Sequence, residues 1–114
     1  MDVEVAFIGV PVSEVPTARD FYERFFGRPA DVVVHENEEM WRLSDAAWLY
    51  VVVDPGRAGR ALAMLSVADL DATLTELAGR GIRPDKLEEY PGRARKATML
   101  DPDGNSVAVG QIPA

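Results

Sequence analysis

The sequence consists of two similar halves. Val12-Ser13-Glu14-Val15 in the first half corresponds to Val67-Ala68-Asp69-Leu70, which lies 55 positions further on. Each of these stretches follows an apolar strand-like segment and precedes a segment with helical spacing of its apolar residues. Three more extended segments complete each half. A period of this length indicates a duplicated βαβββ module rather than a solenoid of short repeats.

The first half begins with an apolar strand over residues 3–10, which Pro11 is expected to end. A helix follows, with Pro16 in its first turn and Gly27 at its end. Its apolar residues recur at i, i+3, i+4, i+7 and i+8 and therefore share one face: Ala18, Phe21, Tyr22, Phe25 and Phe26. The three strands that follow are predicted over residues 30–35, 40–43 and 47–53.

The second half is expected to repeat this order after a linker over residues 56–59. It has a strand over 60–67, a helix whose face carries Leu70, Leu74, Leu77 and Ala78, and strands over 85–89, 94–100 and 106–111. Gly79 and Gly81 are expected to close the helix. We therefore predict an α+β fold in one domain over 1–114, with modules over about 1–55 and 60–114. Side by side, the two sheets would curve into a half-barrel whose concave side forms a ligand cup.

Two motifs carry a family resemblance. The first is Val12-Ser13-Glu14, followed by Ala18-Arg19-Asp20-Phe21-Tyr22 and closing on Phe26-Gly27. The second is Gly92-Arg93, followed by Leu100-Asp101-Pro102-Asp103-Gly104-Asn105 before the last strand. Together with the internal repeat, these motifs resemble the vicinal oxygen chelate superfamily over essentially the whole chain. That superfamily includes glyoxalase I, extradiol dioxygenases, and fosfomycin and bleomycin resistance proteins.

The resemblance implies four inward-pointing positions that hold a metal in the metal-dependent members. Carried over one by one, these positions fall at Phe7, near Tyr50, and at Leu62 and Ala108. Divalent cations need nitrogen or oxygen donors, which phenylalanine, leucine and alanine lack. We therefore expect no metal and no cofactor.

The single histidine, His35, lies beside the acidic residues Glu36, Glu38 and Glu39. Histidine and carboxylates can act as metal ligands or as a general base. We favour the alternative that His35 is an exposed residue at a strand end and that the acidic run is a solvated turn.

Alternation along the strands predicts which side chains line the cup. The expected ligand-binding residues are Phe7, Trp48, Tyr50, Leu62, Met64, Arg93, Met99 and Ala108. Trp41 and Tyr90 are expected near its mouth. Aromatic walls suit planar or cationic ligands. Arg93 and Arg95, on the same side of one strand, offer guanidinium groups for a carboxylate or phosphate.

Composition restricts the partners. The net charge is -7, which argues against nucleic acid because phosphate binding needs clustered basic residues. Without cysteine, a secretion signal or an apolar run of membrane-spanning length, the chain is expected to be cytoplasmic and not to bind membranes. The resemblance also implies a homodimer, with the modules paired within one chain or exchanged between chains.

The function we favour is binding rather than catalysis. Bleomycin resistance proteins sequester a cationic drug without needing a reactive group, so a metal-free relative would bind a cationic or aromatic antibiotic or metabolite. One alternative is a lyase, isomerase or dioxygenase-like enzyme that works without the usual metal, which would require a buried carboxylate or acid–base pair facing the cup. Another is an interaction module whose cup is filled by its own side chains.

Overall fold

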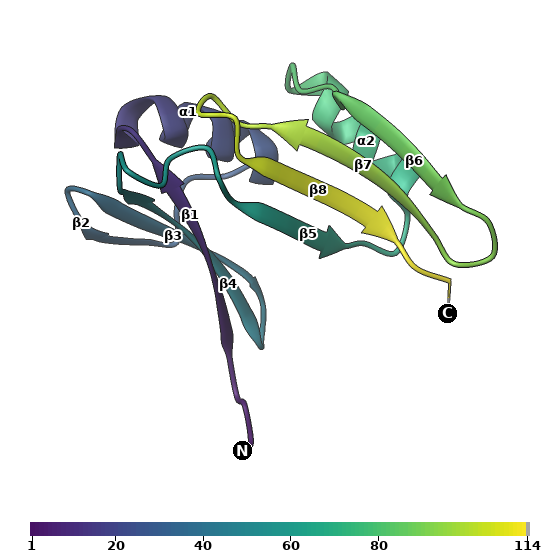
Figure 1. Ribbon diagram of the computed structural model, residues 1–114, viewed down its shortest axis with the longest axis horizontal. Coiled ribbons are helices and arrows are strands. Elements are labelled where there is room, and N and C mark those ends of the chain that lie inside the picture. Colours follow the sequence, from purple (N-terminus) through teal and green to yellow (C-terminus); the bar gives the residue numbers. More distant parts are fainter. Residues whose placement is uncertain (114) are drawn as a thin grey trace.

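The element order strand, helix and three strands occurs twice along the chain (Figure 1). This computed structural model describes residues 1–113. The elements of the first module are β1 (Ala6–Val12), α1 (Val15–Phe26), β2 (Val32–His35), β3 (Glu38–Ser44) and β4 (Ala47–Val53). Those of the second are β5 (Leu62–Ser66), α2 (Leu70–Gly79), β6 (Lys86–Tyr90), β7 (Ala94–Leu100) and β8 (Ser106–Gln111). The predicted α+β fold is confirmed.

Each module forms its own four-stranded sheet. The strand order is β1-β4-β3-β2 in the first sheet and β5-β8-β7-β6 in the second. The pairs β1–β4 and β5–β8 are parallel, and the remaining pairs are antiparallel. Strands β1 and β5 therefore lie at corresponding edges of two separate sheets, which stay open and do not close into a barrel.

Strand β1 continues through Pro11, where the sequence predicted its end. Ala6 donates its amide to Ala46, and the carbonyl of Val12 accepts from Asp54, so the even-numbered residues of β1 bond toward β4. The backbone nitrogen of Pro11 consequently faces the free edge of the sheet, where no ladder hydrogen bond is lost. Proline is tolerated in a strand for this reason only at an edge.

Both helices begin and end as their sequences dictate. Helix α1 has its proline in the first turn and ends at Gly27, whose φ of 75° is readily adopted only by glycine. In α2, the Asp69 side chain accepts a hydrogen bond of 3.0 Å from the amide of Ala72 and so caps the helix. Within residues 1–113, no helix is both long enough and apolar enough to cross a membrane.

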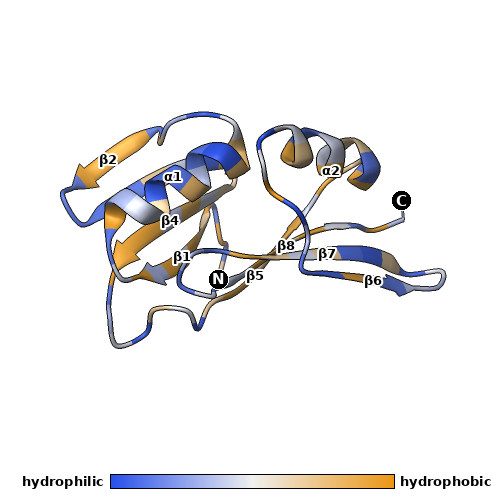
Figure 2. Ribbon diagram, turned by 90° about the horizontal axis from the view of Figure 1, so that it is seen from above, coloured by the Kyte–Doolittle hydropathy of each residue, from blue (hydrophilic) through white to orange (hydrophobic). Residues whose placement is uncertain are grey.

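The helices cover one side of the sheets. In Figure 2 both helices lie on the same side of the molecule, with β1, β5, β6 and β7 toward the other side. One apolar core lies between helices and sheets and extends through both modules; its largest fully buried side chains include Trp41, Tyr22, Leu49, Leu70 and Leu77. The face of each sheet that points away from its helix is here called its open face.

The turn over residues 101–105 joins the second module to the first. The buried hydroxyl of Tyr22 in α1 donates to a carboxylate oxygen of Asp101 at 2.9 Å. Asn105 donates from its side chain to the Pro11 carbonyl and to Asp101, both at 2.8 Å. Ser13 donates its amide to Asp103 at 3.0 Å. The motif residues that carry the family resemblance therefore hold the two modules together.

Candidate functional site

The first open face carries aromatic side chains at its β1 edge. Phe7 on β1 registers with Trp48 on β4, and their rings stack with centroids 6.4 Å apart. Gly9 registers with Tyr50, and a Cβ at Gly9 would lie 2.5 Å from the Tyr50 hydroxyl oxygen. Glycine therefore lets the tyrosine ring lie across β1. Tyr50 also lines a hollow of about 370 Å³ with residues of β1, β4 and the segment between β4 and β5: Gly9, Pro11, Val52, Asp54, Arg57, Arg60 and Ala61.

The second open face contains a hollow of about 300 Å³. Leu62 and Met64 on β5 register with Ser106 and Ala108 on β8, so their side chains emerge on one face of the sheet. The structure thus brings together three of the residues predicted to bind a ligand. The lining residues are Leu62, Ala63, Met64, Lys86, Glu88, Lys96, Thr98, Ser106 and Ala108.

The four positions at which the resemblance places a metal do not fit a divalent cation. Phe7, Leu62 and Ala108 offer no donor atom, and Tyr50 offers one phenol oxygen. Among the described residues, no group of three or more His, Cys, Asp or Glu side chains is placed to hold a metal. His35 is exposed at the end of β2, where its Nδ1 accepts a hydrogen bond of 3.1 Å from the Asn37 amide.

Two buried carboxylates belong to the core side of the molecule. Glu39 is held by Arg19 of α1 through hydrogen bonds from the guanidinium, with Nε to Oε2 at 3.0 Å. Asp101 accepts from Tyr22 and Asn105. Burial and the adjacent Asp101 carboxylate raise the pKa of Tyr22 far above its usual value. These groups stabilise the fold, and neither carboxylate lines the hollows on the open faces.

The sequence predicted that Met99 lines the cup and that Trp41 lies near its mouth, but both side chains point into the core on the opposite side of their strands. Met99 registers with Val107, and only 1% of its surface is exposed, so it packs in the core beneath the helices. Its neighbour Thr98, which registers with Ala108, occupies the open face instead. Trp41 is fully buried against Tyr22 and donates from its indole nitrogen to the Arg28 carbonyl at 3.0 Å.

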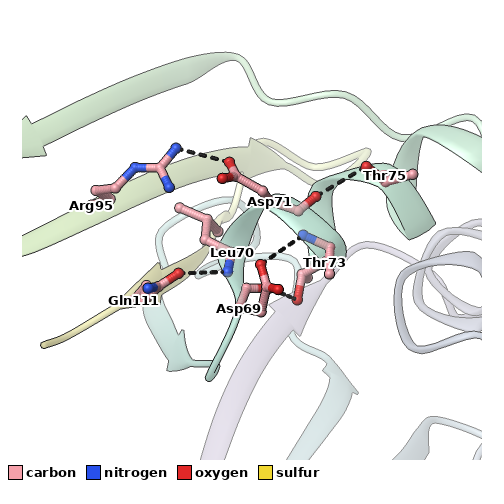
Figure 3. A network of polar contacts seen from close by, with 8 residues as sticks. Asp69, Leu70, Asp71, Thr73, Thr75, Arg95 and Gln111 are labelled. Carbon is pink, nitrogen blue, oxygen red and sulfur yellow. Dashed lines mark hydrogen bonds and ion pairs between the residues drawn. The ribbon is translucent and has the colours of Figure 1, made fainter. Parts of the chain in front are cut away.

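The two arginines near the last hairpin lie apart from the hollow at Leu62. Arg93 belongs to the turn between β6 and β7, and its amide bonds to the Tyr90 carbonyl at 2.8 Å. Arg95 on β7 reaches Asp71 at the start of α2, with nitrogen and oxygen 3.0 Å apart (Figure 3). Both border a separate hollow of about 200 Å³. The predicted grouping of Arg93 with Leu62 and Ala108 is therefore not observed.

Sequence reasoning missed three charged residues on the second open face: Lys86, Glu88 and Lys96. The Glu88 carboxylate accepts a hydrogen bond of 2.7 Å from the Tyr90 hydroxyl and lies 3.6 Å from the Lys86 ammonium. The hydrogen bond from Tyr90 is the largest cause that lowers the pKa of Glu88, and the positive charges of Lys86 and Lys96 lower it further. Alternation along residues 86–90 already indicates that Lys86 and Glu88 share one face of their strand. To assign that face to the cup, one must know which strands pair with one another.

A further groove of about 490 Å³ lies between the two modules. Apolar residues such as Ile8, Phe26 and Leu77 line it together with three arginines. Each arginine already has protein partners: Arg28 and Arg42 pair with nearby aspartates, and Arg80 donates to the Phe25 carbonyl at 3.3 Å. Glu76 is the remaining charged residue of the lining, and within residues 1–113 its side chain takes part in no ion pair or hydrogen bond.

Comparisons with known proteins agree with this architecture. The Glyoxalase/Bleomycin resistance protein/Dioxygenase superfamily matches residues 4–109. A glyoxalase/bleomycin resistance protein from Catenulispora acidiphila is 38% identical with a TM-score of 0.91, over 96% of this chain and 98% of that chain. TnmS3, an antibiotic binding protein from Streptomyces sp. CB03234, is 29% identical with a TM-score of 0.73, over 96% of this chain and 95% of that chain.

A lactoylglutathione lyase from Agrobacterium tumefaciens shares the fold with a TM-score of 0.77 at 17% identity, over 97% of this chain and 95% of that chain. No curated protein sequence matches the chain. The family match covers most of the described residues, and the structural likeness covers nearly the whole of each chain. The chain therefore belongs to the Glyoxalase/Bleomycin resistance protein/Dioxygenase superfamily.

Proposed function

We propose that this chain is a metal-free small-molecule binding protein whose open faces form the walls of an aromatic-lined cup. One observation carries the proposal. The positions that hold a metal in metal-dependent relatives carry Phe7, Tyr50, Leu62 and Ala108, so a ligand there meets rings and aliphatic groups. Such walls favour an aromatic ligand, because stacking adds about 0.5–1.5 kcal/mol to the burial of apolar surface.

An antibiotic or aromatic metabolite is the ligand class we propose. The similarity to TnmS3, which is described as an antibiotic binding protein, supports this class. A purely cationic ligand is less well supported, because the hollows do not gather unpaired carboxylates. Asp54 in the first hollow lies 3.7 Å from the Arg57 guanidinium, and Glu88 in the second accepts from Tyr90.

We further propose that a second copy of the chain completes the cup. Leu62 is 89% exposed and Phe7 is 56% exposed, although both are large apolar side chains. They stand on β1 and β5, the edge strands of two separate sheets. Placing the first sheet of one copy beside the second sheet of the other would cover both residues and enclose a ligand between two walls.

Tryptophan fluorescence tests the binding proposal. Trp48 stands half-buried on the open face, whereas Trp41 is enclosed in the core, so an aromatic ligand in contact with the open face should quench Trp48 more strongly than Trp41. Titration with a panel of planar aromatic antibiotics is expected to quench the parent protein. The variant Trp48→Phe retains Trp41 as the control emitter and should show little quenching. Equal quenching in both proteins would contradict the proposed site.

A further inference from the structure

The chain contains two lysines, and both stand on the second open face. Lys86 on β6 registers with Thr98, and Lys96 on β7 registers with Glu88. Along each strand, successive side chains point to opposite faces of the sheet. Lys86 and Lys96 occupy positions whose side chains point away from the helix, so their ammonium groups lie on the same side of neighbouring strands. Both line the hollow that Leu62 and Ala108 also line.

The local charge of this hollow is opposite to that of the whole molecule. Glu88 is the one carboxylate among the lining residues, so two lysines against one glutamate leave a net positive charge. The protein as a whole has a net charge of -7. Among the described residues, Lys86 lies 3.6 Å from Glu88, whereas Lys96 has no ion-pair partner within 4.0 Å. Local charges, more than net charge, determine which ionic group a site attracts.

We propose that Lys86 and Lys96 bind the acidic group of the ligand, so that the preferred ligand is an aromatic anion. This inference rests on the proposed binding function and narrows its ligand class. The apolar side chains of Leu62, Met64 and Ala108 receive the ring, and the ammonium groups at the wall formed by β6 and β7 donate to a carboxylate, sulfonate or phenolate. Hydrogen bonds between charged partners are stronger than neutral ones, particularly beside an apolar surface.

The first hollow points to the same ligand charge. Its lining residues include Arg57 and Arg60 against the single carboxylate of Asp54. Arg57 pairs with Asp54, which leaves Arg60 as an additional cation. Both walls of the proposed cup therefore carry a small excess of positive charge, and a cationic ligand would be disfavoured at either wall.

Two fluorescent probes test the inference on the intact chain. 8-Anilinonaphthalene-1-sulfonate carries a sulfonate, and N-phenyl-1-naphthylamine has the same ring system without it. The quantity compared is the ratio of the two dissociation constants. In Lys96→Gln or Lys86→Gln, the dissociation constant of the sulfonate probe is expected to rise about fivefold relative to that of the uncharged probe, and in the double variant it should rise further. Arg83→Gln, at an exposed position outside the hollow, removes the same charge and should leave the ratio unchanged.

Amine labelling of the parent protein gives a second measurement. Because the side-chain amines are confined to Lys86 and Lys96, acylation followed by peptide mass spectrometry reports directly on the hollow. Saturation with the sulfonate probe should slow acylation of both lysines. If both probes bind but the lysine variants keep the parent ratio, or the lysines stay unprotected, the anion inference is wrong and the binding function stands. If neither probe binds, both proposals fail.

Discussion

The buried hydroxyl of Tyr22 is one of the groups that link the two modules. Tyr22 is fully enclosed in the core, and its hydroxyl donates to Asp101, which has 4% of its surface exposed. Removing the donor leaves a buried carboxylate oxygen with only Asn105 as a neighbouring side-chain donor. The resemblance motif identified Tyr22 as characteristic, but its partner lies 79 positions away and is visible only in the folded chain.

Tyr22→Phe is expected to lower the free energy of unfolding by about 2 kcal/mol, since a hydrogen bond to a charged group is lost. Urea denaturation should show a lower midpoint with an unchanged slope. Tyr90→Phe is the matched control, because its hydroxyl also bonds a carboxylate but the ring is exposed. We expect a change of at most about 0.5 kcal/mol there. Equal losses in the two variants would show that burial of Tyr22 is unimportant.

The same tyrosine makes stability sensitive to alkaline pH. The pKa of Tyr22 is raised in the folded state above its usual 10.0, so unfolding releases a proton once the pH exceeds that value. Stability should therefore fall by up to about 1.4 kcal/mol per pH unit above pH 10. Tyr22→Phe lacks this proton and should show a shallower decline between pH 10 and 11. Parallel declines in the two proteins would contradict the assignment.

At the scale of the element, the two modules use different means to begin their helices. Asp69 caps α2 by accepting from the amide of Ala72, whereas Glu14, at the equivalent position before α1, makes no cap hydrogen bond. In α1 the proline of the first turn, Pro16, fixes the backbone and removes one amide that would need a partner. Sequence similarity between the modules therefore does not imply that the residues before α1 and α2 contribute equally to the free energy of unfolding.

Asp69→Ala is expected to cost about 1 kcal/mol of stability, because an N-cap side chain is lost. Glu14→Ala, the corresponding change in the first module, should cost less than about 0.5 kcal/mol. Thermal or urea unfolding of the two variants beside the parent protein measures both values. A larger loss for Glu14→Ala would mean that its side chain supports α1 in a way that the cap geometry does not reveal.

The elements were more predictable than the faces of their strands. Strands β4, β7 and β8 begin and end as the sequence predicted, since turn residues and alternation define them locally. The face occupied by Met99 could not be derived in this way, because a one-residue change in register moves every side chain of a strand to the opposite face. Pairing of β7 with β8 places Thr98, and not Met99, beside Ala108. The same limitation concealed Lys86 and Lys96.

At the scale of the whole molecule, the open faces expose large apolar side chains that a single copy leaves uncovered. The sequence repeat predicted two modules, but it did not reveal whether their sheets pair within one chain. The separate sheets leave Phe7 and Leu62 on uncovered edge strands. The proposed second copy would bury them, and burial of apolar area contributes about 25 cal/mol per Å² before the entropic cost of association.

For the proposed dimer, Leu62→Glu is expected to give a monomer without unfolding the chain, because the side chain is already exposed in one copy. Sedimentation velocity measures the mass, and circular dichroism checks the fold. Leu87→Glu provides the matched control: Leu87 is 65% exposed but does not line the second open-face hollow, so that variant should remain dimeric. A parent protein that sediments as a monomer would refute the proposed second copy.

Pro11 would limit how far the proposed assembly could grow. Its nitrogen faces outward from β1 but carries no hydrogen, and its carbonyl is already engaged by Asn105. A strand arriving from another molecule would find only the Phe7 and Gly9 part of β1 open for bonding, too short a stretch to propagate into a continuous fibre. One imino acid at this border thus favours a closed, finite complex over open-ended aggregation.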